Sequence, residues 1–240
     1  MKKRKILRVC HKFLIDNDGY DLDIQDLCCS TSKKYDNFIF TYINTTIKKY
    51  IKKNNLLKKG QFYYHPATKT HIFPLEYSMK HKNYLQDFYL FKNIINYAKP
   101  FRKVINQIKP DIVHIHGTLL PQFLFVANLA RKNSKVIATH HIGLINQNYQ
   151  QQKYRITLLK YGIHNLFPFF CNQIVSVSHH GKKSFDFLRK KVKVINPVPL
   201  IPIRISKFKN FSQHNQLKND FQLKSNNIYS CLGRINHQKN

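Results

Sequence analysis

The chain has 240 residues, of which 41 are Lys or Arg and 11 are Asp or Glu, so its formal net charge is +30. Hydrophobic residues make up 42% of it and aromatic residues 13%, which is enough to build a core and excludes a disordered polycation. A chain of this length holds one large domain or two small ones, and its apolar runs are too short for a membrane span.

Two scarce residue types narrow the function classes further. The 7 glycines are widely separated, so neither a G-x-G-x-x-G fingerprint nor a Walker A loop occurs, and a P-loop NTPase or an ordinary dinucleotide-binding dehydrogenase is not expected. Glu76 is the only glutamate, so these residues cannot complete a mechanism that needs two glutamates.

The five cysteines form neither an even disulfide framework nor a C-x-x-C spacing, which indicates buried apolar thiols in a reducing compartment. The start MKKRKILRVC resembles the basic region of a signal peptide, but its apolar run stops at Arg8. We therefore expect a cytoplasmic protein that begins directly with a strand.

The first predicted elements alternate short strands with helices, which indicates βα repeats and a parallel sheet. Strands are predicted at Ile6–Cys10 and Phe38–Tyr42, and between them the acid-rich segment Asp16–Leu27 leads into a first helix. One or two further short strands contain Tyr63 and the segment His71–Phe73.

The longest periodic stretch runs from Asn83 to Ile108. Apolar residues recur there every three or four positions, which predicts a helix packed on a sheet. Pro100 should kink this helix or divide it in two. Pro110 then ends it, and Asp111–His116 (DIVHIH) predicts a buried strand.

Further helices and strands alternate along the second half of the chain. Helices are predicted at Pro121–Asn133, Tyr154–Asn165 and Lys182–Leu188, and strands at Lys135–Thr139, Asn172–Ser178, Val192–Ile195 and Ile228–Leu232. The proline-rich segment Asn196–Pro202 and the polar stretch after it favour a connector. We therefore expect one domain over residues 1–198, a linker over 199–227, and the first strand and loop of an incomplete second domain over 228–240.

Five ordered segments carry a resemblance to a known family: PDIVHIHG (110–117), VIATHH (136–141), IVSVSHHGKKSF (174–185), KVKVINPV (191–198) and YSCLGRINHQK (229–239). Together they resemble the family 4 glycosyltransferases of the GT-B fold. The resemblance implies an α/β, Rossmann-like parallel sheet with flanking helices as the N-terminal half of that fold. It also implies a retaining enzyme that moves a sugar from a nucleotide-sugar donor to a glycan or lipid-linked acceptor, as in surface polysaccharide or glycolipid synthesis, with no metal and no cofactor.

The resemblance also implies roles for particular residues. His141 matches the family's cleft histidine and is the candidate catalytic residue, where an imidazole can exchange a proton near neutrality. His116 and His140 are candidate acceptor or cleft residues. Gly19, Arg234 and Lys239 match positions that hold the donor phosphates, and two cations there could neutralise the leaving diphosphate. His114 is instead expected to be a hydrogen-bonded core histidine.

The sequence departs from the family in two places. The first loop has Asp18-Gly19 where the family has a Gly-Gly pair, and the E-x(7)-E motif of the donor domain cannot be present with Glu76 alone. We therefore expect an acceptor domain with a truncated donor domain, weak or inactive as written. The alternative is a non-catalytic module that binds carbohydrate or a membrane surface.

Other interpretations concern metals and polyanions. Four histidines at two strand ends (114, 116, 140 and 141) could bind zinc, and the D-x-D triplets near Asp21 could belong to a metal-dependent GT-A transferase. Acids at a helix N-terminus, where they complement the helix dipole, explain those triplets better, because only one strand precedes them. The charge of +30 fits compositional bias, peripheral association with the inner face of an anionic membrane, or, less well, nucleic-acid binding.

Overall fold

A computed structural model describes residues 3–15, 19–43, 45–76, 86–118, 120–141, 162, 164–177, 179–183, 185 and 192–194. All of them belong to a single compact unit of the chain. The predicted connector, linker and C-terminal strand, together with Arg234 and Lys239, lie outside the described residues.

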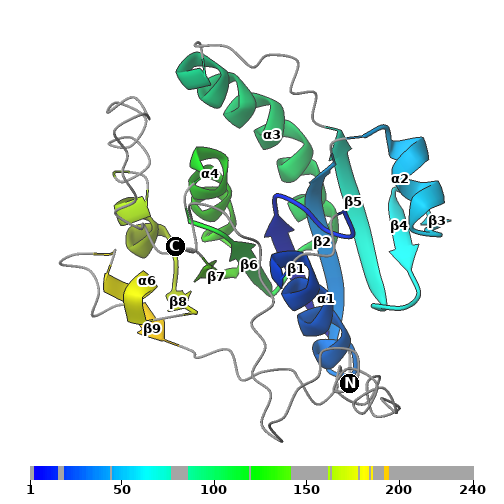
Figure 1. Cartoon of the computed structure of the whole chain (residues 1–240), viewed down its shortest axis with the longest axis horizontal. Helices are drawn as coiled ribbons and strands as arrows, with labels where there is room; N and C mark the ends of the chain where they lie inside the picture. The colour runs from blue at the N-terminus through cyan, green and yellow to red at the C-terminus, as the bar shows by residue number, and fades with distance from the viewer. Residues whose placement is uncertain are drawn as a thin grey trace, which may run out of the picture. The chain divides into compact units, whose positions relative to one another are not determined.

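The described strands form a nine-stranded sheet in the order β3-β4-β5-β2-β1-β6-β7-β8-β9 (Figure 1). From β5 to β9 every neighbouring pair is parallel. These strands are β1 (Arg4–Cys10), β2 (Tyr35–Ile43), β5 (Thr70–Glu76), β6 (Ile112–His116), β7 (Lys135–His140), β8 (Gln173–Ser176) and β9 (Val192–Val194). The predicted Rossmann-like parallel sheet is confirmed.

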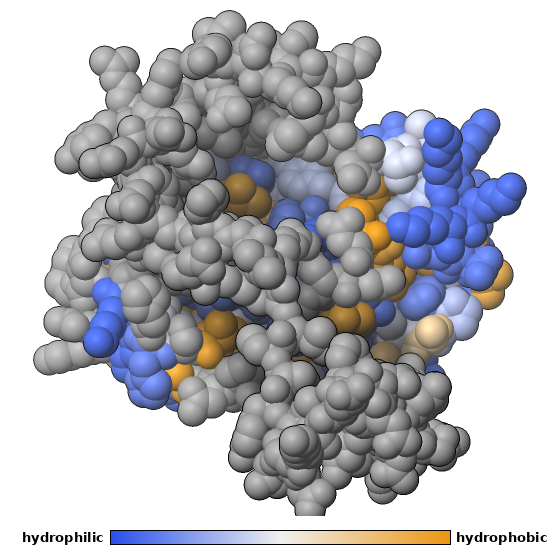
Figure 2. Space-filling view, in the orientation of Figure 1, coloured by the Kyte–Doolittle hydropathy of each residue, from blue (hydrophilic) through white to orange (hydrophobic). Residues whose placement is uncertain are grey.

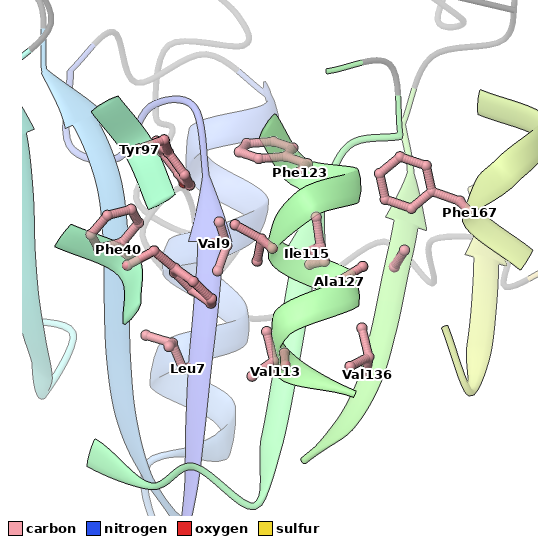
Figure 3. Packing of buried hydrophobic residues seen from close by; sticks show 14 of the residues in the cluster. Leu7, Val9, Phe40, Tyr97, Val113, Ile115, Phe123, Ala127, Val136 and Phe167 are labelled. Atoms are coloured by element: carbon pink, nitrogen blue, oxygen red, sulfur yellow. The ribbon is translucent and has the colours of Figure 1, made fainter. Parts of the chain in front are cut away.

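Helices cover both faces of the sheet. On one face, α1 (Gly19–Thr31) and α2 (Ile47–Lys53) contribute Ile24, Cys28 and Tyr50 to one buried cluster. On the other face, α3 (Gln86–Ile108), α4 (Pro121–Ala130) and the helical residues 164–170 pack on a larger cluster. Figure 3 shows this larger cluster, with α4 in front of the strands and α1 behind them.

Strand β1 is buried on both faces because the sheet is covered twice. Leu7 and Val9 face the larger cluster, whereas Cys10 belongs to the smaller one (Figure 3). A near-continuous apolar run is typical of a central parallel strand, and here it is interrupted only by the buried cation Arg8, which is 2% exposed.

Pro100 lies inside α3 without dividing it, so the predicted split is wrong. The carbonyl that a proline leaves without its helical partner is that of Asn96, and Asn96 is exposed, where water can satisfy it. Tyr97, Phe101 and Val104 on the opposite side are fully buried and hold the helix against the sheet.

The segment between β2 and β5 departs from the predicted pattern. It contains α2, β3 (Leu57–Lys59) and β4 (Phe62–His65), and β3 and β4 extend the sheet in antiparallel pairing. Helix α2 and strand β3 are lysine-rich and carry little apolar periodicity, so they escaped prediction. Gly60, with φ of +62°, makes the tight β3–β4 turn that only a left-handed residue allows.

The last described helix is displaced from its predicted position. Helix α6 (His179–Lys183) begins three residues before the predicted Lys182, and Phe185, which falls inside the predicted helix, lies in the turn after it. Phe185 is fully buried in the larger cluster, so it anchors that turn. The preceding helix reaches residue 170, beyond the predicted end at Asn165.

Candidate functional site

The chain reverses its direction of winding between β1 and β6. Strand β1 pairs with β2 on one side and with β6 on the other. The helices that follow these two strands, α1 and α4, lie on opposite faces of the sheet. Open α/β sheets bind ligands at the carboxyl ends of the strands at such a switch point.

Four aromatic side chains meet at this point, and we call them the α1-face cluster: His11, Tyr20, His116 and His141. The Nδ1 atom of His116 lies 3.3 Å from Nε2 of His141. The Tyr20 ring lies 4.9 Å from the His141 ring, edge-on, and 4.5 Å from that of His11. The Tyr20 hydroxyl donates a hydrogen bond to the His116 carbonyl oxygen at 2.7 Å, which ties the start of α1 to the end of β6.

Burial favours the neutral form of His116 and of His141. It lowers the pKa of His141 to about 4, with a further lowering from His11, and it lowers the pKa of His116 well below its usual value. Burial therefore disfavours the imidazolium form of His141, because that cation would lose its hydration here. At pH 7 His141 acts as a neutral hydrogen-bonding group.

The tautomers of the pair follow from one unpaired atom. Within the described part of the chain, the buried Nε2 of His116 has no hydrogen-bond partner. Burying a lone pair costs less than burying an N–H group without an acceptor, so the proton of His116 is assigned to Nδ1. His116 then donates to Nε2 of His141, and the proton of His141 sits on Nδ1.

The buried cation Arg8 lies on the α1 face of the sheet, next to the α1-face cluster and nearer the amino ends of β1 and β6. Arg8 donates from Nη1 to Nδ1 of His114 at 2.8 Å and from Nη2 to the Thr31 hydroxyl at 3.1 Å. Because arginine can only donate, His114 carries its proton on Nε2 and donates to the Thr139 hydroxyl at 2.7 Å. The expectation for His114 agrees with these two bonds. This network links β1, β6, β7 and α1 beneath the site.

His140 lies on the opposite face of the sheet, in what we call the α4-face cluster: Thr118, His140, His164 and Phe185. The Thr118 hydroxyl lies 2.7 Å from Nδ1 of His140 and 2.8 Å from Nδ1 of His164. The Phe185 ring packs on both imidazoles. Burial lowers the pKa of His140 to about 3 and that of His164 to about 4.

The structure thus brings His116 and His141 together and separates both from His140. The four histidines considered for zinc do not converge, because successive residues of β7 point to opposite faces. Among the residues that the structure describes, no group of three or more His, Cys, Asp or Glu side chains is placed to hold a metal ion.

Gly19 is the first residue of α1, next to Tyr20, and so lies at the same edge as the cluster. Sequence reasoning missed Arg8, His11 and Tyr20. The signal was available for His11, which directly follows the first strand, and for Tyr20, which follows the candidate Gly19 at the helix start. Arg8 offered no such signal, since it is one of 41 cations.

Gly117 shapes the end of β6. Its φ of +122° is a conformation that side-chain-bearing residues rarely adopt, and its N–H donates to the Thr139 carbonyl at 2.8 Å. The turn sends the chain from the α1 face to the α4 face, which separates His116 from Thr118.

No protein-family model matches this chain, and no curated protein matches it. Solved structures do match. An E. coli structure described as trehalose-6-phosphate, bound with UDP-2-fluoro glucose, has a TM-score of 0.53 at 14% identity, over 91% of this chain and 54% of its own. The N-terminal domain of Candida albicans trehalose-6-phosphate phosphatase has a TM-score of 0.52 at 13% identity, over 92% and 54%.

Sucrose-phosphate synthase from Thermosynechococcus elongatus has a TM-score of 0.52 at 11% identity, over 80% of this chain and 48% of its own. The chain therefore spans about half the length of the structures it matches. These likenesses establish the fold: the described unit is a Rossmann-like domain of the GT-B kind. Among the helices of the described residues, none has the length and apolar character needed to cross a membrane.

Proposed function

We propose that this chain provides the acceptor-binding half of a retaining glycosyltransferase that moves a sugar from a nucleotide-sugar to a glycan or lipid-linked acceptor on the cytoplasmic side of a membrane. The observation that carries the proposal is the α1-face cluster at the switch point of a GT-B-like sheet, where His141 is held by His116 and Tyr20. The E. coli neighbour bound with UDP-2-fluoro glucose supports a nucleotide-sugar donor.

The cluster suits the recognition of a sugar hydroxyl. A neutral His141 with its proton on Nδ1 can donate a hydrogen bond to a hydroxyl oxygen, and its ring and that of Tyr20 offer apolar faces. Its lowered pKa favours the neutral imidazole over a charged acid at neutral pH. In the proposed reaction, His141 orients the transferred sugar or the acceptor, and it does not supply the proton.

The buried guanidinium of Arg8 adds a positive potential below the cluster. The Arg8 charge contributes, after burial, to the lowered pKa of both His114 and His116, and His116 belongs to the cluster. Such a field favours an anionic ligand, as a nucleotide diphosphate would be. Gly19, at the start of α1, has no side chain and would let the same ligand approach its backbone closely. Arg234 and Lys239 would complete the phosphate contacts in this proposal.

The direct test is ligand binding observed at the histidines. The full chain is titrated with UDP-glucose, UDP-N-acetylglucosamine, GDP-mannose and a panel of oligosaccharide acceptors, while NMR follows the histidine ring signals. We expect at least one ligand to shift the signals of His116 and His141. His65, at the end of β4, and His71, near the start of β5, serve as internal controls, since both lie away from the carboxyl ends of the parallel strands. If no ligand shifts His116 and His141 more than these controls, the proposal fails.

A second measurement separates catalysis from binding. With Glu76 as the only glutamate, we expect weak or no release of nucleotide from UDP- or GDP-sugars by these 240 residues. Release at ordinary enzyme rates would contradict that expectation and show that the residues present suffice. Acceptor binding without release would favour the alternative of a non-catalytic carbohydrate-binding module.

A further inference from the structure

The helix and strand that the sequence pattern did not predict carry a dense group of cations. We call it the α2–β3 patch: Lys48, Lys49, Lys52, Lys53, Lys58 and Lys59, all of them exposed. Figure 2 shows hydrophilic residues gathered on the right, where α2, β3 and β4 lie in Figure 1. From Asn37 to Leu75 the sequence contains no Asp or Glu, so no acid of this segment neutralises the patch.

The charge of α2 is costly to the helix itself. Lys48 and Lys52, like Lys49 and Lys53, stand four residues apart on its solvent side, and like charges at that spacing destabilise a helix. Lysines on an edge strand discourage pairing with other chains, which accounts for Lys58 and Lys59. Protection of an edge strand cannot explain the lysines of α2, because α2 is a helix. An anionic partner would turn the repulsion into attraction.

An apolar side chain lies within the patch. Leu57, the first residue of β3, is 54% exposed and is followed directly by Lys58 and Lys59. An exposed apolar residue flanked by lysines suits a lipid surface, where the apolar group enters the headgroup region and the amines contact anionic headgroups. Nucleic-acid binding would instead need exposed aromatic rings for stacking. Tyr64 is half-buried and packs under Lys59, with Nζ 4.2 Å from the ring centre.

The patch lies close to the candidate site along the sheet. The Ile47 N–H at the start of α2 donates to the Glu76 carboxylate at the carboxyl end of β5, which is the edge where the site lies. Lys53 Nζ donates to the Ile15 carbonyl in the loop that follows β1. A surface bound to α2 and β3 would therefore lie beside the loop that leads to His11 and Tyr20.

We infer that the α2–β3 patch docks the protein on an anionic lipid bilayer. The inference builds on the membrane association in the proposed function and names the surface that makes it. Docking through this side edge of the sheet leaves the carboxyl edge open next to the bilayer, where a lipid-linked acceptor would present its headgroup.

The test is flotation of the full chain with phosphatidylcholine vesicles containing about 30% phosphatidylglycerol, at low and at high salt. The patch variant carries Lys48→Gln, Lys49→Gln, Lys52→Gln and Lys58→Gln. The control variant loses the same charge from exposed lysines elsewhere: Lys33→Gln, Lys34→Gln, Lys103→Gln and Lys132→Gln. We expect binding by the patch variant to be weaker by more than about tenfold, and by the control variant to change less than about threefold.

Thermal unfolding shows whether both variants fold. The patch variant should melt no lower than the wild type, because its substitutions relieve repulsion within α2. A Leu57→Ser variant should bind at low salt but lose the part of the binding that survives high salt.

Equal loss in the patch and control variants would overturn the inference, because it would show that only total charge matters. Absence of binding by the wild type at low salt would do the same. A patch variant that loses binding to poly(U) but keeps binding to vesicles would assign the patch to nucleic acid. None of these measurements needs sugar transfer, so the vesicle-binding result can be interpreted even if the proposed reaction does not occur.

Discussion

His140 and His141 are neighbours in the chain but belong to different structures. His141 lies in the α1-face cluster with His116 and Tyr20, at the switch point of the sheet. His140 lies in the α4-face cluster, where it shares the Thr118 hydroxyl with His164 and is 1% exposed. Successive side chains at the end of a strand face opposite ways, so one histidine packs in the core and its neighbour joins the cluster at the switch point.

The largest effect on the α4-face cluster should come from Thr118. Replacing Thr118 by Val removes the hydroxyl that is hydrogen-bonded to Nδ1 of both buried imidazoles, so the free energy of unfolding should fall by about 2–3 kcal/mol. Urea unfolding measures it. Thr118→Ser keeps the hydroxyl and should retain most of the stability, and ligand shifts at His141 should persist in both variants. Equal stability of the Val variant and the wild type would show that the cluster does not hold the two faces together.

Acid should weaken the fold through the same histidines. The pKa of His140 is lowered to about 3 and that of His164 to about 4, so between pH 6.5 and these values the unfolded chain binds protons that the folded chain refuses. The stability that the two neutral histidines contribute is fully present above their unfolded pKa and is lost as the pH falls below it. The free energy of unfolding should fall by about 2 kcal/mol for each histidine between pH 7 and pH 5.

The acid effect is measured as the free energy of unfolding in urea at both pH values. The variant His164→Gln keeps a hydrogen-bonding side chain but cannot titrate, so its loss of stability on acidification should be smaller by about 2 kcal/mol. An unchanged loss would mean that His164 is already solvated in the folded protein.

Substitutions in the α1-face cluster should lower ligand affinity more than they lower the free energy of unfolding. His141→Ala would remove the proposed hydrogen bond to the sugar, so affinity for a ligand identified by NMR should fall about tenfold. Unfolding should be affected less than in His140→Ala, which opens a cavity beside Phe185. Isothermal titration and urea unfolding of both variants make the comparison. Greater loss of affinity in His140→Ala would reverse the assignment of the two residues.

The smallest expected effect concerns Tyr20. Tyr20→Phe removes the hydrogen bond to the His116 carbonyl but keeps the ring, so stability should fall by about 1 kcal/mol. The His116 and His141 ring signals should shift, whereas those of His140 and His164 should not. Shifts at all four histidines would show that the two faces are coupled through the sheet.

The sequence predicted most elements and the fold class. The alternation of strands and helices located β1, β2, β6, β7 and β9 to within a few residues, and the apolar periodicity located α3 and α4. The sequence pattern did not predict α2 or β3. Helix α2 buries a single residue, Tyr50, among its lysines, and all three residues of β3 are exposed. Hydrophobic periodicity in a sequence arises from side chains that are buried, and α2 and β3 bury few of theirs.

The sequence by itself determined that histidines stand at the carboxyl ends of two buried strands. The apolar runs predict the two strands, and the histidines follow at the end of each, at the edge of the sheet where parallel sheets have their binding sites. By sequence, His140 groups with His116 and His141, whereas the structure places His140 on the opposite face. Only the tertiary structure decided which face holds α1, and therefore which histidine meets Tyr20 and which meets His164. Those partners come from elements distant in the chain, and only packing of the helices on the sheet brings them together.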